Sequence, residues 1–170
     1  MFRYLCRFWM LAAGWKTNPT LPKGVEKCVM VAAPHTSNMD LIYMIGAFSL
    51  YGLSLRFAIK KEWMRFPYSL IMKPLGAIGI DRSPKKAGEK RKSVVEATVN
   101  LYQDKKELIV VIAPEGTRDL REKWKTGFYH IALQANLPIM LGYVDYAKKE
   151  AGVGKAIMPS GDIEKDLDEI

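Results

Sequence analysis

The sequence predicts one α/β domain, with a mostly parallel or mixed central sheet flanked by helices. Residues 28–33 and 108–113 are short apolar runs rich in β-branched side chains, which is typical of buried strands. Each run ends in Ala-Pro and then polar residues, and an apolar pattern of helical period comes later in the chain. A chain of 170 residues is long enough to bury a core of its own.

The remaining elements are predicted in chain order from apolar spacing and from Gly and Pro positions. The predicted helices cover residues 1–15, 41–53, 94–102 and 127–134, with a short acidic helix starting at 160–162. The predicted further strands cover residues 55–59 and 138–146, with a last edge strand at 153–158. Residues 17–27 contain two prolines and a glycine and are predicted to form a connector. Lysines and arginines dominate residues 83–92, which precede the third of these helices.

The first residues are predicted to form an amphipathic helix, residues 1–16, ahead of the main domain at 17–170. Arg3 and Arg7 lie on one narrow side of this helix, and aromatic and aliphatic residues cover most of the rest. Such a helix suits a membrane interface, with Phe2, Phe8, Trp9 and Trp15 as the apolar contacts. The alternative is a helix packed on the core with both arginines in water. Arg7 interrupts the apolar run that a signal peptide needs.

The composition restricts the kind of partner. The formal charge of +8 predicts an anionic one, which could be membrane lipid, a phosphorylated substrate or nucleic acid. No apolar run approaches the length of about 20 residues that a membrane-spanning helix needs. Cys6 and Cys28 make neither a metal site nor a disulfide framework, and Cys28 is predicted to be buried.

His35 and Asp40 are the first candidate catalytic residues. Pro34 cannot donate a hydrogen bond to a sheet, so the strand ends there and His35 follows it directly. Ser37 and its neighbours suit a helix N-cap, which places Asp40 near the first helical turn. A carboxylate facing the imidazole across this loop fixes its tautomer and stabilises its charged form, as a general base requires.

The second apolar strand is followed by Glu115, Gly116, Thr117 and Arg118. If the two strands are parallel neighbours, these residues converge with His35 in the crevice outside the carboxyl ends of the strands. Gly116 would let the backbone approach a ligand closely, and the guanidinium of Arg118 has the shape to bind a phosphate.

The pattern His35-x4-Asp40 followed by Glu115-Gly116-Thr117-Arg118 resembles the glycerol-3-phosphate and lysophosphatidic-acid acyltransferase family. Residues 79–82 are similar to the second sequence block of that family and residues 137–140 to the fourth. The resemblance implies transfer of a fatty acyl group from acyl-coenzyme A or acyl-acyl carrier protein to the hydroxyl of a lyso-lipid or glycerol phosphate. It implies no cofactor and no metal, and it implies a peripheral location on the cytoplasmic face of the cell membrane, whose surface is anionic.

The resemblance also implies a role for each site residue. His35 takes the proton of the acceptor hydroxyl and Asp40 orients it, while Arg118 and Arg82 hold the acceptor phosphate. Glu115, Gly116 and Thr117 shape the phosphate pocket, or Glu115 positions Arg118 instead.

Two other functions are compatible with parts of the sequence. A basic module binding nucleic acid fits the charge, but the cations are scattered and the aromatic residues suit a core or membrane better than a stacking platform, so no nucleic acid is expected. A metal-dependent hydrolase could use His35, Asp40 and Glu115 as ligands, but phosphate-binding arginines are poor neighbours for a cation. His130, alone on its helix, is predicted to be structural.

Overall fold

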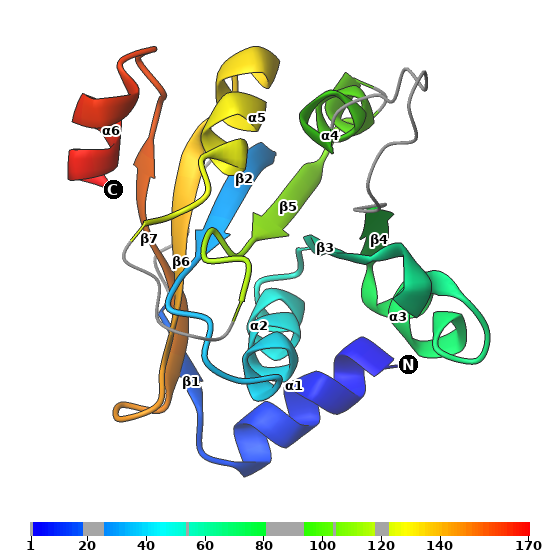
Figure 1. Ribbon diagram of the computed structural model, residues 1–170. Coiled ribbons are helices and arrows are strands. Elements are labelled where there is room, and N and C mark those ends of the chain that lie inside the picture. The colour runs from blue at the N-terminus through cyan, green and yellow to red at the C-terminus, as the bar shows by residue number, and fades with distance from the viewer. Residues whose placement is uncertain (1, 19–25, 54, 81–93, 104, 118–122) are drawn as a thin grey trace.

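The structure is a computed structural model that describes residues 2–18, 26–53, 55–80, 94–103, 105–117 and 123–170. Its strands form one mixed sheet flanked by helices on both faces (Figure 1), which confirms the predicted fold class. Within the described residues the sheet has seven strands in the order β1-β7-β6-β2-β5-β3-β4. Their bounds are β1 Lys16–Thr17, β2 Lys27–Ala32, β3 Leu55–Lys60, β4 Ala77–Ile80, β5 Leu108–Ile112, β6 Ile139–Asp145 and β7 Glu150–Ile157.

The central strands are parallel, and the antiparallel pair is the hairpin of β6 and β7. Strand β2 lies between β5 and β6, with Val29 opposite Val110 on one side and Ile139 on the other. Because β2 is central, both of its faces are covered, which explains its nearly continuous apolar sequence.

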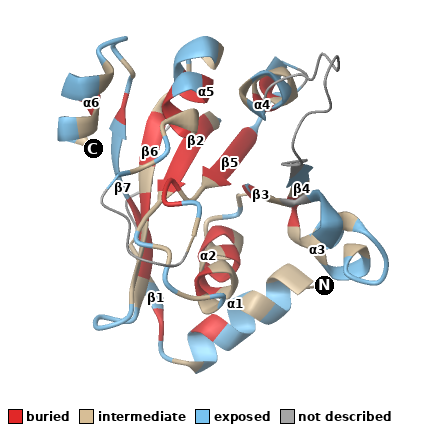
Figure 2. Cartoon of the chain, viewed as in Figure 1, coloured by how far each residue is buried: buried red, intermediate tan, exposed pale blue. Residues whose placement is uncertain are grey.

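The helices divide between the two faces of the sheet. Their bounds are α1 Phe2–Ala12, α2 Met39–Leu50, the 3₁₀ helix η1 Lys61–Met64, α3 Ser69–Leu75, α4 Val94–Gln103, α5 Gly127–Ala135 and α6 Ile163–Glu169. Alternate residues of β2 point to opposite sides: Met30 packs with α2, α1 and α3, whereas Val29 packs with α4, α5 and α6. Two apolar cores therefore lie back to back, with the most buried residues on the central strands (Figure 2).

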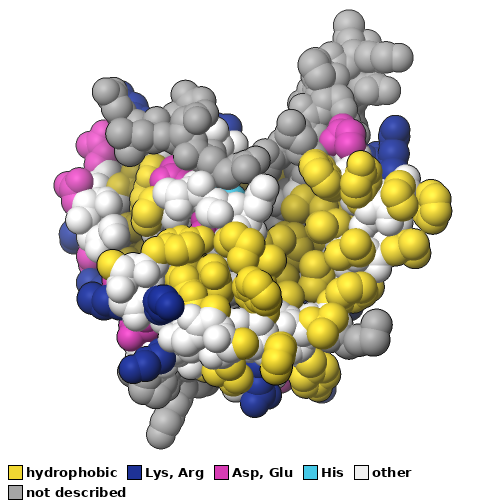
Figure 3. Space-filling view, turned by 90° about the horizontal axis from the view of Figure 1, so that it is seen from below, with side chains coloured by type: hydrophobic (Ala, Val, Ile, Leu, Met, Phe, Trp, Pro, Cys, Tyr) yellow, Lys and Arg dark blue, Asp and Glu magenta, His cyan; other side chains and the backbone are white. Residues whose placement is uncertain are grey.

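Helix α1 packs along α2 by its narrow side. Met10 is fully buried, and a Cβ at Gly46 of α2 would lie 3.0 Å from both Cys6 O and Met10 Sδ, a tight contact, so glycine favours the close approach of the two helices. Arg3 lies on this buried side and donates a hydrogen bond to Leu53 O at 2.5 Å. The broad apolar side of α1 faces outward instead, and hydrophobic side chains gather over this part of the surface (Figure 3).

Trp15 differs from its predicted role as a membrane contact. The helix ends at Ala12, Gly14 turns the chain with a positive φ of 75°, and Lys16 enters β1 beside β7. This turn brings Trp15 against α2, where its ring stacks on Tyr43 at 3.8 Å and is buried. The indole therefore belongs to the core of the protein.

Several short elements have no counterpart in the prediction. Helix α3 contains Pro74, which interrupts the usual helical pattern, and β4 has four residues, one of them Gly79. The two residues of β1 pair with Glu150 and Ala151 at the start of β7, so β7 is an edge strand only after Ala151. Strand β7 also begins earlier than predicted, at Glu150.

Candidate active site

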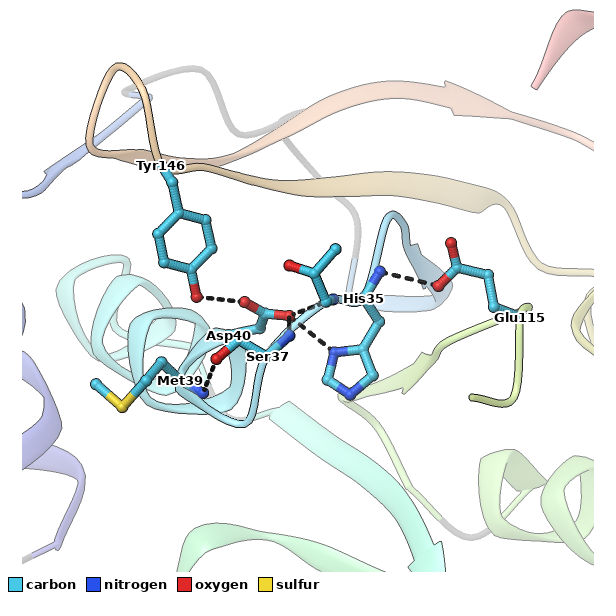
Figure 4. A network of polar contacts seen from close by, with 7 residues as sticks. His35, Ser37, Met39, Asp40, Glu115 and Tyr146 are labelled. Carbon is cyan, nitrogen blue, oxygen red and sulfur yellow. Dashed lines mark hydrogen bonds and ion pairs between the residues drawn. The ribbon is translucent and has the colours of Figure 1, made fainter. Parts of the chain in front are cut away.

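The site lies where the two predicted strands end side by side. Val31 of β2 is paired with Ile112 of β5 in parallel register, so the loops that follow both strands leave the sheet at the same edge. One loop carries His35 and leads into α2, and the other carries Glu115 (Figure 4). The two strands are therefore parallel neighbours, which is the condition under which the sequence places His35 and Glu115 together.

His35 and Asp40 face each other across the first loop. Nδ1 of His35 lies 2.9 Å from Oδ2 of Asp40, and the His35 side chain keeps 31% of its surface exposed. The neutral tautomer that fits this contact carries its proton on Nδ1, which leaves the lone pair on Nε2. The structure thus places an accessible imidazole next to a buried carboxylate, as a general base requires.

Asp40 also holds the loop that carries His35. The same Oδ2 accepts the backbone N–H groups of Thr36 at 3.0 Å and Ser37 at 2.9 Å. Asn38 occupies the N-cap position of α2 but makes no capping bond with its side chain, while the Ser37 hydroxyl accepts the N–H of Met39 at 3.1 Å. Ser37 thus plays a capping role at the start of this helix, and Asp40 fixes both the backbone and the imidazole of the loop.

Glu115 reaches the same loop from the other strand. Its side chain is buried, and Oε2 accepts the backbone N–H of His35 at 2.9 Å. The sequence alone suggested a role in the phosphate pocket or beside Arg118 and did not anticipate this contact. The bond ties the ends of β2 and β5 together and orients Glu115 toward the backbone of His35. Among the described residues, no group of three or more His, Cys, Asp or Glu side chains is arranged to hold a metal ion.

Gly116 closes the tight turn that begins at Ala113, and its backbone N–H donates to Ala113 O at 3.2 Å. Its φ of +66° lies in the region that favours glycine, and a Cβ there would lie 2.6 Å from Nζ of Lys125. Lys125 is held over this turn because its backbone N–H donates to Pro114 O at 2.9 Å. Sequence analysis did not single out Lys125, so the cation beside Gly116 is a new feature of the site. Arg82 and Arg118 lie outside the described residues, and their predicted roles stay predictions.

Tyr146 is a second residue that sequence reasoning missed. It follows β6 directly, and its hydroxyl donates to Oδ1 of Asp40 at 2.5 Å. Burial raises the pKa of Tyr146 to about 12, and the hydrogen bond to Asp40 acts in the same direction. No local pattern marks this tyrosine, because 106 residues separate it from Asp40.

Comparison with known proteins agrees with this geometry. The family model described as Acyltransferase matches residues 17–141. The chain belongs to the Acyltransferase family. The match includes both loops of the site and the strands that carry them, so the protein is an acyltransferase enzyme.

A solved structure supports the fold of this acyltransferase. The chain is similar to the 1-acyl-sn-glycerophosphate (LPA) acyltransferase PlsC from Thermotoga maritima, with a TM-score of 0.66 and 14% sequence identity. The similarity covers 99% of this chain and 74% of that one. Comparison with curated protein sequences finds no match. Across the residues that the structure describes, no helix of this acyltransferase combines the length and the apolar character needed to span a bilayer.

Proposed function

We propose that this acyltransferase moves a fatty acyl group from an acyl thioester to the hydroxyl of a lysophospholipid or glycerol phosphate in membrane lipid biosynthesis. The donor is acyl-coenzyme A or acyl-acyl carrier protein. The observation that carries the proposal is the contact of 2.9 Å between His35 Nδ1 and Asp40 Oδ2 at the carboxyl end of β2. The similarity to a lysophosphatidic-acid acyltransferase fold supports the choice of acceptor.

In this mechanism the acceptor itself is the nucleophile. Nε2 of His35 takes the proton of the acceptor hydroxyl while the oxygen attacks the thioester carbonyl carbon. The tetrahedral intermediate then collapses, the carbon–sulfur bond breaks, and the imidazolium returns its proton to the leaving thiolate. Asp40 stabilises the imidazolium between these two steps. General base catalysis of this kind contributes about 10²–10⁴-fold to the rate.

The acceptor phosphate is proposed to bind beside the turn at Gly116. Arg118 and Arg82 supply the guanidinium groups, Thr117 lines the same turn, and the ammonium of Lys125 adds a positive charge over it. Glu115 is proposed to support the site through the backbone of His35, since its carboxylate accepts that N–H.

An assay of thiol release tests the proposed reaction. Acyl-coenzyme A and acyl-acyl carrier protein are supplied as donors, with glycerol-3-phosphate and lysophospholipids of different head groups as acceptors. We expect release that depends on the acceptor, and we expect His35→Ala to abolish it. Asp40→Asn should lose most of the activity, because the tautomer of His35 is no longer enforced. His130→Gln serves as the matched control, since His130 lies exposed on α5.

Circular dichroism confirms that each variant is folded. If folded His35→Ala turns over at nearly the rate of the unaltered protein, the mechanism is wrong.

The acyltransferase is further proposed to bind the cytoplasmic face of the cell membrane peripherally. Large apolar side chains are exposed on α1 and on the segment that runs from η1 into α3. These side chains are Tyr4, Leu5, Phe8, Trp9, Leu11, Trp63, Phe66, Tyr68, Leu70 and Ile71. Hydrophobic side chains gather on the face of the molecule seen from below (Figure 3).

Exposed cations accompany them at Arg7, Lys61, Arg65 and Lys73. Aromatic rings among cations suit an anionic interface, so binding should be stronger on anionic than on zwitterionic vesicles and should weaken with salt.

A further inference from the structure

Tyr146 contacts Asp40 from the side opposite His35 (Figure 4). Asp40 has two carboxylate oxygens, and the structure uses them differently. Oδ2 faces His35 Nδ1 and the backbone of the loop, whereas Oδ1 accepts the hydroxyl of Tyr146 at 2.5 Å. A carboxylate that accepts hydrogen bonds on both oxygens cannot rotate without losing several of them together.

The ring of Tyr146 is held by two other aromatic residues. Trp15 meets it edge-on at a centroid distance of 5.1 Å, and Tyr43 of α2 meets it at 5.9 Å with nearly perpendicular planes. Trp15 and Tyr43 in turn stack on each other. Tyr146 is 44% exposed as a whole residue, so the orientation of its hydroxyl depends on these ring contacts and on the bond to Asp40.

We propose that Tyr146 is a positioning residue for the acyl transfer reaction, acting on His35 through Asp40. The hydroxyl holds the carboxylate in place and draws part of its negative charge away from the imidazole. This inference rests on the proposed role of His35 as general base. Tyr146 thereby gives the hairpin of β6 and β7 a part in catalysis, in addition to the residues that follow β2 and β5.

The direction of the pH effect follows from the charges around the pair. Removing the hydroxyl leaves the negative charge of Asp40 less dispersed, so the imidazolium of His35 is stabilised more and keeps its proton to a higher pH. Other polar groups of this region are the Ser37 side chain, which also hydrogen-bonds Tyr146, Glu115 at the His35 backbone and Lys125 beside Gly116, while Asp145 pairs with Lys148 on the hairpin itself. Tyr146→Phe leaves all of these side chains present.

The test compares Tyr146→Phe with Tyr143→Phe. The first variant keeps the ring and loses the bond to Asp40. The second removes a hydroxyl from the same hairpin, one that donates to Glu150, and is the matched control. His35 is titrated by NMR in each protein, with His130 as internal reference, since the chain has two histidines. Measuring kcat/KM for thioester consumption against pH gives the second readout.

In Tyr146→Phe we expect the midpoint of the His35 titration to move up by about half a pH unit, and the acidic limb of kcat/KM to move with it. A hydrogen bond to a charged carboxylate is stronger than one between neutral groups, so its loss changes the charge that Asp40 presents to the imidazole. At pH values well below the midpoint, this shift lowers kcat/KM by about threefold, in addition to any loss that is also seen at high pH. His130 should titrate as before, and Tyr143→Phe should move neither readout. A His35 midpoint unchanged in Tyr146→Phe, or an activity loss equal at every pH, overturns the inference.

The two readouts separate this inference from the proposed function. If His35→Ala keeps its activity, the general-base mechanism fails. The NMR titration then still decides whether Tyr146 acts on His35 through Asp40. If His35→Ala is inactive and the titration midpoint does not move in Tyr146→Phe, only the inference about Tyr146 fails.

Discussion

The two sides of helix α1 should respond differently to alanine substitution. Met10 lies on the buried side with 0% of its surface exposed, and Phe8 lies on the outer side with 71% exposed. Met10→Ala leaves a cavity against Gly46 of α2, whereas Phe8→Ala removes a ring that contacts solvent. The pair therefore separates the stability of the fold from attachment to a membrane, within one helix.

The magnitudes follow from burial. Truncating a fully buried Met costs about 2–5 kcal/mol, which for a chain of this size lowers the melting temperature by on the order of 10 °C. An exposed substitution changes stability by about 0.5 kcal/mol or less. If the Phe8 ring enters the membrane interface, losing it costs about 2 kcal/mol of binding, which is roughly 30-fold in vesicle affinity.

Thermal melting and sedimentation with anionic vesicles measure both effects. We expect Met10→Ala to melt early but to bind vesicles normally at a temperature where it is folded. Phe8→Ala should melt normally and bind weakly. Deleting residues 1–15 would confuse the two effects, because it also removes the buried Trp15. If Phe8→Ala melts as early as Met10→Ala, or binds vesicles as well as the unaltered protein, the outer side of α1 is not a membrane contact.

Two further predictions concern the loop after β5 and its proposed phosphate site. Arg118→Ala and Arg82→Ala should raise the KM of the acceptor far more than that of the thioester, with Lys rescuing only in part; equal effects on both substrates would mean structural roles. Glu115→Ala should lower stability by about 1–3 kcal/mol and reduce kcat without a selective change in acceptor KM, because the N–H of His35 loses its partner. Glu115→Gln keeps an oxygen that can accept this N–H, so its effects on stability and kcat should be smaller. A large rise in the KM of the acyl acceptor in either variant would instead indicate that Glu115 contacts that substrate directly.

The sequence determined the parts of this protein that depend on neighbouring residues. Apolar runs that end in Ala-Pro placed β2 and β5, and helical spacing placed α2, α4 and α5 to within a few residues. The five-residue separation of His35 and Asp40 across a strand end and a helix start was enough to predict their contact. Proline, N-caps and side-chain period act within a few residues, so these features are visible in one linear string.

Tertiary structure alone decided the contacts that complete the site. Glu115 meets the N–H of His35 over a separation of 80 residues, and Tyr146 meets Asp40 over 106. Trp15 looked like a membrane anchor in the sequence, yet the turn at Gly14 places it in the core against Tyr43. Such contacts depend on strand order, sheet register and the packing of helices on the sheet. Those features arise when the whole chain buries its apolar surface together, and no local pattern encodes them.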